Sequence, residues 1–302
     1  MNENSENISI TAIILNYKNY NDVYNCIISL EKQNLTSRQN LSLLIIDNGS
    51  QDDNTKKLQQ EFPQHKFIFN NANLGFAKAV NQGIKAKQDQ SDYFLLVNND
   101  AELAPDCLSH LLITSQNSAI TGPAICYKNK PETIWQSGGF FSKLRMNIVN
   151  PLKNKTYKKQ APQKVNFLSG CVLLIPKKII LKLGLFDENL FFYGEDLDYC
   201  LRAKSQNIDI NYCAEARAWH NIENIASSRT SAFVLENIAF SYIYNLKKHF
   251  FNLKLYGYLL FILAYSPFRL YQIIKGGNSV KNIFPWFKGA YRAYKTKRAS
   301  LS

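Results

Sequence analysis

The sequence predicts an α/β fold in which helices cover both faces of a central sheet, followed by a helical C-terminal segment. Short β-branched segments alternate with helix-like stretches over the first hundred residues, and polar side chains follow directly after these strands. Acidic residues are absent after Asn237. At 302 residues and 46% hydrophobic composition, the chain is long enough for one large domain or a domain with an appendage.

The first strand–helix units are the clearest. Residues 8–15, "ISITAIIL", have the β-branched composition of a buried strand. Residues 22–33 place apolar side chains at 23, 26, 27 and 30, which is the spacing of one helix face, with Asp22 as the expected N-cap. The segment "LSLLIID" (41–47) is a second buried strand and ends in the turn "DNGSQDD".

The alternation continues through a strand at 66–70, a helix at 76–87 and a strand at 93–100. Right-handed crossovers place the ends of such strands along one edge of the sheet, where ligands bind in this class of fold. Polar clusters follow the strands, and we expect them to meet in space: Asn16, residues 47–50, residues 71–75 and residues 98–100.

The second half is less regular. Residues 140–165 are polar, basic and poor in periodicity, which predicts a mobile surface loop. After this loop we expect a strand at 165–176, a short helix closed by Gly184, a helix from Glu195 and a final strand that ends at His220.

The charge distribution excludes one function class. The chain has 36 basic and 23 acidic residues, but 11 of the basic ones lie after Asn237, so the larger module is nearly neutral. A nucleic-acid-binding protein spreads its basic face over the recognition module, so no nucleic-acid partner is expected. Six cysteines without a CxxC pair indicate reduced thiols in a cytoplasmic setting, and the polar N-terminus lacks the layout of a signal peptide.

Two polar clusters suggest ligand binding. The strand "YFLLVNND" ends in Asp100, which could cap a turn or bind a divalent ion, and an ion bound to a diphosphate needs only one or two protein carboxylates. Gly75 would let a ligand approach the backbone, with Asn73 and Asn81 supplying amide groups. The alternative is an ordinary helix packed on the sheet.

The stretch "FFYGEDLDYCLR" (191–202) crowds three acids beside aromatic side chains. All three acids would interact favourably with a helix dipole, but Asp196 and Asp198 point in different directions. We expect one carboxylate to act as a base in a cleft while another pairs with Arg202, four residues after Asp198. His220 ends a strand and could be a structural residue or complete a Mn²⁺ or Mg²⁺ site.

Six motifs occur in order between residues 8 and 230: "AIILNYKN", "LLIIDNGSQDD", "NANLGFAKAVNQGI", "YFLLVNNDAEL", "FLSGCVLLIPKKIILKLGLFDENLFFYGEDLDYCLRAKSQN" and "AWHN". This set resembles the inverting family 2 glycosyltransferases, in particular the rhamnosyltransferase-like branch that builds bacterial surface polysaccharides. The resemblance implies a GT-A fold, with a nucleotide-binding half and an acceptor half around one continuous mixed sheet.

The resemblance also implies roles for residues. Asp196, in the family's "ED" motif, would be the catalytic base, while Asp100 and His220 would bind Mn²⁺ or Mg²⁺ held by the diphosphate. Asp47 would hydrogen-bond the pyrimidine base. The other residues implied at the donor nucleotide are Asn16, Tyr17, Asn48, Asn73, Gly75, Asn81 and Asn98. Asn98 stands where the family motif expects Asp, which leaves Asp100 as the only carboxylate of "NND".

The expected reaction is metal-dependent inverting transfer from a UDP- or dTDP-sugar, such as dTDP-rhamnose, to a hydroxyl of a saccharide or lipid-linked saccharide. A nucleotidyltransferase is an alternative, but it would carry a Gly-rich basic signature near the N-terminus, and "ILNYKNYND" has neither property. A non-catalytic membrane-surface scaffold is the other alternative.

We predict two regions, a catalytic domain at 1–236 and a basic, aromatic-rich helical region at 237–302. Residues 255–268 carry no charge, but 14 residues are too few for a membrane-spanning helix, which needs about 20. We therefore expect this region to lie on the anionic inner face of the cell membrane. The alternative is a helical hairpin packed on the catalytic domain or on a second subunit, as in a homodimer.

Overall fold

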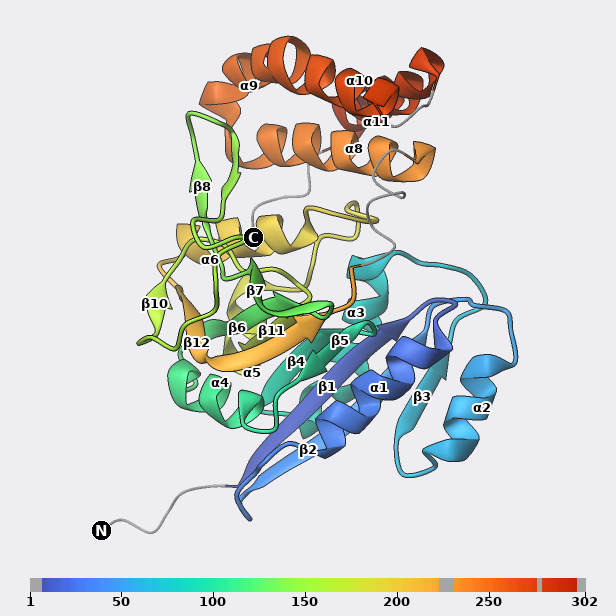
Figure 1. The fold of residues 1–302 in the computed structure, drawn as a ribbon, viewed down its shortest axis with the longest axis vertical. Helices are drawn as coiled ribbons and strands as arrows, with labels where there is room; N and C mark the ends of the chain where they lie inside the picture. The colour runs from blue at the N-terminus through green and yellow to red at the C-terminus, as the bar shows by residue number, and fades with distance from the viewer. Residues whose placement is uncertain (1–6, 223–230, 276–278, 298–302) are drawn as a thin grey trace.

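The computed structural model describes residues 7–222, 231–275 and 279–297, and the predicted α/β fold is confirmed (Figure 1). The N-terminal half contains β1 (Ile8–Asn16), α1 (Tyr20–Glu31), β2 (Gln39–Asp47), α2 (Asn54–Glu61), β3 (Lys66–Phe69), α3 (Phe76–Lys87), β4 (Tyr93–Asn98), β5 (Ala101–Leu103) and α4 (Cys107–Ser115). The second half contains β6 (Ala119–Tyr127), β7 (Lys130–Gln136), β8 (Phe140–Ser142), β9 (Asn147–Val149), β10 (Gln163–Lys164), β11 (Val172–Pro176), α5 (Lys177–Leu183), α6 (Glu195–Ser205) and β12 (Asp209–His220).

One mixed sheet of ten strands runs through the described part of the molecule in the order β10-β12-β6-β11-β4-β1-β2-β3, with β5 paired to β12 and β7 paired to β6. β1, β2, β3 and β4 are parallel to one another, because the chain returns through a helix between successive strands. β11 is antiparallel to β4, which makes the sheet mixed. The parallel strands therefore end together on one edge.

Alternate residues of the central strands fill two separate cores. Ile10, Ala12 and Ile14 of β1 face one side, where α1, α2 and α4 pack. Ile13 faces the other side, where α3, α5 and α6 pack. Burial on both faces explains why β1 and β4 are mostly apolar.

The structure differs from the sequence-based expectation at residues 140–165. This segment was expected to be a surface loop, but it contains a hairpin of β8 and β9, and β10 pairs antiparallel with β12 at the edge of the main sheet. These strands are two or three residues long, so they leave no periodic pattern in the sequence. The N-cap of α1 is also corrected, because the Asn19 side chain accepts the hydrogen bond from the Asp22 backbone N–H.

The C-terminal region forms a helical layer on top of the α/β body (Figure 1). It contains α8 (Ala232–His249), α9 (Lys254–Leu260), a π-helical turn (Phe261–Tyr265), α10 (Ser266–Lys275) and α11 (Phe284–Lys295). α8 lies between the body and the outer helices, and it begins before the predicted boundary at residue 236. Among the described residues, none of the helices has both the length and the apolar character needed to cross a bilayer.

Candidate active site

The strand register gathers three predicted residues at the carboxyl edge of the sheet. Asn16 is the partner of Asp47 in the β1–β2 pair, and Leu15 is the partner of Asn98 in the β1–β4 pair. Asn16, Asp47 and Asn98 therefore end three adjacent parallel strands. This edge is the ligand-binding edge of open α/β sheets.

Asp47 is buried and is held by the turn that follows its strand. Its Oδ1 atom accepts hydrogen bonds from the Ser50 hydroxyl and, at 3.3 Å, from the Ser50 backbone N–H. Asn16 is equally buried: its amide group donates to Thr55 Oγ1 at 3.1 Å, and its Oδ1 accepts from Asn99 at 3.0 Å. Both side chains are thus fixed before any ligand arrives.

Asn48 organises the loop before α3. Its Oδ1 accepts hydrogen bonds from Asn70 and from the Leu74 backbone, and its Nδ2 donates to Asn73 Oδ1 at 3.0 Å. Asn73 Oδ1 also accepts from the Gly75 N–H at 2.9 Å. Asn73 remains exposed at the rim, so this loop is shaped by Asn48 while Asn73 stays accessible.

Gly75 is required for a close approach within the protein. Its φ is +80°, and a Cβ at this position would lie 2.6 Å from the Phe191 carbonyl oxygen. The adjacent Phe76 N–H donates to that same carbonyl at 2.9 Å. This contact joins the start of α3 to the aromatic stretch before α6, a purpose that the sequence did not reveal.

Asn81 has a structural set of contacts. Its Nδ2 donates to the Phe186 carbonyl at 2.9 Å and to Glu188 Oε1 at 3.0 Å, and its Oδ1 accepts from the Phe186 N–H at 3.0 Å. The side chain is buried and both ends of its amide are occupied, so Asn81 holds the loop that leads to α6. Tyr17, in contrast, is 45% exposed just after β1.

Asp100 and His220 meet although 120 positions separate them. Ala101 of β5 pairs with His220 of β12, and the Asn221 N–H donates to the Asp100 carbonyl at 2.9 Å, so antiparallel pairing brings the two side chains together. His220 Nε2 lies 2.9 Å from Asp100 Oδ1. Burial by itself would lower the pKa of His220, but its contacts with Cys171 and Asp100 raise that pKa to about 10.

The donor chemistry of this pair fits a divalent ion once His220 loses the proton that its raised pKa favours, because only a neutral imidazole coordinates a metal. The Asp100 carboxylate and the His220 Nε2 atom, which lie 2.9 Å apart, would then be its two protein ligands. Within the described ranges, no group of three or more His, Cys, Asp or Glu side chains could hold a metal ion. An ion here would therefore take its remaining ligands from phosphate oxygens and water, which is how Mg²⁺ binds at nucleotide sites.

Asp196 lies in the first turn of α6, next to the residues that precede β11. Its Oδ2 accepts a hydrogen bond from the Gly170 N–H at 3.2 Å, and the next residue, Cys171, interacts electrostatically with His220, Asp100 and Asp196. The dipeptide 170–171 therefore connects the candidate base with the Asp100–His220 pair.

Glu195 is a buried carboxyl group next to Asp196, which is half-buried. Its Oε2 atom has no hydrogen-bond partner among the described residues. Burial, together with the adjacent Asp196 charge, raises the pKa of Glu195, and burial raises the pKa of Asp196. Two adjacent carboxyl groups in this setting do not both ionise readily, so one proton is retained on the pair over a wide pH range.

Asp198 is fully buried and has a different task. Arg202 Nε lies 2.9 Å from its Oδ2, as the i, i+4 spacing predicts, while Lys248 and His249 of α8 each lie 2.7 Å from its Oδ1. Burial alone would raise the pKa of Asp198, but the His249 hydrogen bond and the charges of Arg202 and Lys248 hold it well below its usual range. Sequence reasoning missed Lys248 and His249, because about 50 positions separate them from Asp198.

Helix α8 also holds the loop before α6. The Ser241 hydroxyl donates to the Tyr193 carbonyl, and Asn245 Nδ2 donates to the Gly194 carbonyl at 3.1 Å. Gly194 has a φ of +81°, and a Cβ there would lie 2.8 Å from Ser241 Cβ. The geometry of "FFYGED" therefore depends on a helix outside the motif.

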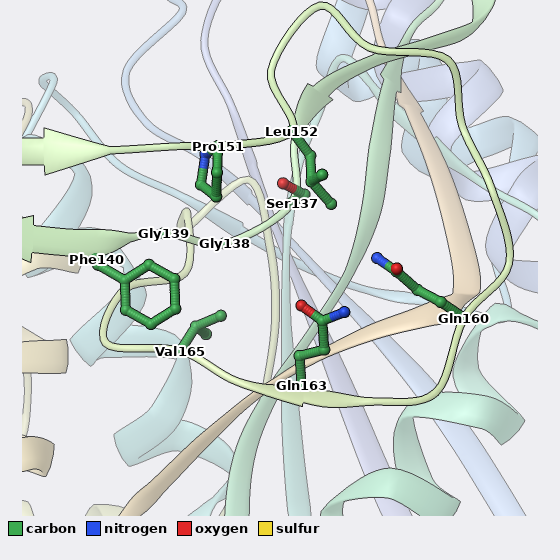
Figure 2. A pocket seen from close by; sticks show the side chains of 9 residues that line it. All are labelled: Ser137, Gly138, Gly139, Phe140, Pro151, Leu152, Gln160, Gln163 and Val165. Atoms are coloured by element: carbon green, nitrogen blue, oxygen red, sulfur yellow. The ribbon is translucent and has the colours of Figure 1, made fainter.

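A separate cavity of about 90 Å³ opens between the end of β7 and the segment that contains β10 (Figure 2). Gln160 and Gln163 approach it from one side, and Ser137 and Leu152 from the other. Amide and hydroxyl groups of this kind suit a hydroxyl-rich ligand.

Comparison with known proteins agrees with this geometry. The model of "Glycosyl transferase family 2" matches residues 11–184. A low-salt glycan biosynthesis hexosyltransferase, Agl10, from Haloferax volcanii is 25% identical over 223 residues, covering 70% of this chain and 67% of the relative. An N-acetylglucosaminyl-diphospho-decaprenol L-rhamnosyltransferase from Mycobacterium tuberculosis is 25% identical over 194 residues, covering 56% of this chain and 62% of the relative.

The chain thus spans about two thirds of the length of these relatives. A crystal structure of GalNAc-T7 with UDP, GalNAc and Mn²⁺ superimposes with a TM-score of 0.57 at 16% identity, covering 80% of this chain and 51% of that chain. This similarity supports the GT-A architecture. Because the family model covers more than half of the sequence, the chain belongs to glycosyl transferase family 2.

Proposed function

We propose that the protein is a metal-dependent, inverting glycosyltransferase that uses a nucleotide-diphosphate sugar, UDP- or dTDP-linked, with dTDP-rhamnose as one candidate. The observation that carries the proposal is the meeting of Asp100 and His220, 2.9 Å apart, on the sheet edge where Asp47 and Asn16 end their strands. The nucleotide would lie along this edge, with its base at Asp47 after β2 and its diphosphate at Asp100 after β4.

Asp196 is the proposed base. Its raised pKa makes it a better proton acceptor than an ordinary carboxylate, because the catalytic efficiency of a base is greatest when its pKa lies near the working pH. In this proposal Asp196 removes the proton from an acceptor hydroxyl, and that oxygen attacks the anomeric carbon from the face opposite the leaving diphosphate. Inversion of configuration follows from this single displacement.

Asp100 and His220 would hold Mn²⁺ or Mg²⁺, and a bound divalent ion would supply neutralisation of charge on the leaving diphosphate. Asn98, which ends β4 two positions before Asp100, is proposed to supply an amide group to the donor nucleotide. Tyr17 and Asn73, both exposed at the rim, are proposed to line the nucleoside. Gly75 and Asn81 are proposed to act by positioning the loops around it, since their contacts are with Phe191 and Phe186.

The proposed acceptor is a saccharide or lipid-linked saccharide in surface-polysaccharide synthesis, met at the inner face of the cell membrane. One relative is named for an acceptor on a decaprenol diphosphate. The basic C-terminal region, with 11 Lys and Arg and no acid after Asn237, supports an anionic membrane as partner. Residues 237–302 are proposed as a membrane-associated region attached to the catalytic domain, 1–236.

The experiment is a screen of nucleotide sugars for diphosphate release by the purified full-length chain, with and without Mn²⁺. Metal-dependent release of UDP or dTDP from one donor supports the proposal. Release of pyrophosphate from a nucleoside triphosphate and a sugar phosphate would indicate a nucleotidyltransferase. The absence of both turnover and nucleotide binding would favour a non-catalytic scaffold.

A further inference from the structure

The outer surface of the C-terminal layer has an apolar face without a partner in the described structure. α9, the π-helical turn and α10 form one helical stretch from Lys254 to Lys275. Seven large side chains on it are between 49% and 72% exposed. One is Ile274, and we call the other six the outer stripe: Leu255, Leu259, Ile262, Leu263, Phe268 and Tyr271. The first four follow the i, i+4, i+7, i+8 spacing of one helix face.

The opposite face of this stretch is already packed. The Phe261 ring stacks on Trp286 of α11 at 4.8 Å, and the Trp286 indole N–H donates to the Ser266 hydroxyl at 2.9 Å. Ile273 is buried in the same core. A surface helix with one apolar face buried should present polar side chains outward, so the apolar outer stripe indicates a surface that is covered in use.

The surrounding charges select the occupant. Lys254, Arg269 and Lys275 lie on the same helical stretch, and the chain after Asn237 contains no acidic residue. If a second copy of the chain packed on this face, its Lys and Arg side chains would lie against the same cations and repel them. An anionic surface is complementary instead, and aromatic side chains such as Tyr271 suit the boundary between lipid headgroups and acyl chains.

The β8–β9 hairpin extends this surface. The Tyr256 hydroxyl donates to the Leu144 carbonyl at 2.5 Å, and the Tyr265 hydroxyl donates to the Arg145 carbonyl. Leu144 is 76% exposed at the tip, between Lys143 and Arg145. Figure 1 shows the hairpin rising from the body to the outermost helical layer. The hairpin therefore adds a second element with the same combination as the outer stripe, an exposed apolar side chain flanked by cations.

We propose that the outer stripe and the Leu144 tip insert together into the headgroup region of an anionic bilayer, with the helix lying in the plane of the membrane. This inference names the surface for the membrane partner given under the proposed function and rests on that partner, but not on the sugar-transfer chemistry. The surface is tied to the site, because α8 packs below it and holds the loop before Asp196.

The test is flotation of the full-length chain with vesicles of phosphatidylcholine alone or mixed with phosphatidylglycerol. The variant is Leu259→Glu with Leu263→Glu, and the matched control is Leu181→Glu, which changes a 60% exposed leucine on α5. We expect wild type and control to float with the anionic vesicles and the stripe variant to partition at least about tenfold less, because each Leu loses its apolar contact with lipid.

Flotation of the stripe variant at the wild-type level would overturn the inference. Failure of the wild-type chain to float with anionic vesicles would also overturn it. A stable dimer that the stripe variant dissociates, measured by light scattering, would also overturn it in favour of a second copy. Diphosphate release by the stripe variant, measured without vesicles, tests the sugar-transfer reaction separately from membrane binding. If wild type floats but turns over no donor, the surface stands and the proposed reaction fails.

Discussion

The Nζ atom of Lys248 lies 2.7 Å from Oδ1 of Asp198 and 2.8 Å from Oδ2 of Asp187, and all three side chains are buried. Lys248 comes from α8, Asp198 from α6, and Asp187 from the loop between α5 and α6. One ammonium group therefore joins the C-terminal helical layer to the helix that begins with the candidate base. The C-terminal region contributes to the catalytic half.

Lys248→Met should lower the free energy of unfolding by about 3–5 kcal/mol, because it leaves two carboxylates buried without their shared cation. Chemical denaturation at neutral pH measures the change. The control is Lys288→Met: Lys288 pairs with Glu236 but is 71% exposed, so its loss should cost less than about 1 kcal/mol. Equal effects of the two substitutions would contradict a structural role for the buried network.

Asp196→Asn should reduce kcat by about 10²- to 10⁴-fold, the usual contribution of a general base. Binding of the donor should change little, because the proposed nucleotide contacts are at Asp47 and Asp100, whereas Asp196 accepts its hydrogen bond from Gly170. Steady-state kinetics and calorimetric titration with the nucleotide separate the two effects. Asp209→Asn, at an exposed pair with Lys164, is the control, and wild-type turnover by Asp196→Asn would mean that another group is the base.

Glu195→Gln should leave the acid limb of the pH–rate profile unchanged. The base must be ionised, so activity falls as the pH drops through the pKa of Asp196, which burial raises. Burial and the adjacent Asp196 charge raise the pKa of Glu195 to about 8, so Glu195 is already protonated and neutral where Asp196 loses its charge. The neutral carboxamide of Gln reproduces that state, and pH–rate profiles of the two proteins measure the comparison. A limb displaced to lower pH in the variant would show that Glu195 carries a charge while Asp196 titrates.

Asp100→Asn and His220→Ala should each raise the Mn²⁺ concentration needed for half-maximal activity by at least about tenfold, because the pair would supply both protein ligands of the ion. Titration of activity with Mn²⁺ at saturating donor measures this. His110→Ala is the control, since His110 lies on α4 and its side chain pairs with Asp106 and Glu215 instead of with the candidate site. A shift in the control as large as in the variants would point to a general loss of folding.

Much of the fold was predictable because its information is local. α3 and α6 begin where the sequence indicated, since apolar periodicity and turn residues mark them within a few positions. The structure of residues 140–165 was not predictable, because β8, β9 and β10 are too short to show a pattern. In addition, β10 pairs with β12, which lies far along the chain. The i, i+4 pair of Asp198 and Arg202 was predictable for the same local reason.

The site was predictable only where motifs carried it. The family resemblance implied that Asp100 and His220 share a metal site, which composition alone did not. The pairing of β5 with β12, which brings them together across 120 positions, was not predicted. The contacts of Asn81 with Phe186 gave a positioning role to a residue expected at the nucleoside. The cations of α8 had no local signal at all, because nothing in "NLKKHF" indicates which carboxylate they reach.

One divalent ion and one nucleotide diphosphate should bind together where Asp100 meets His220. Anomalous diffraction from crystals grown with Mn²⁺ and UDP or dTDP tests it most directly. One manganese peak is expected about 2.0–2.3 Å from Asp100 Oδ1 and from His220 Nε2, next to the diphosphate, with the pyrimidine ring of the nucleotide beside Asp47. A manganese–diphosphate complex bound elsewhere, with the Asp100–His220 hydrogen bond intact, would contradict it.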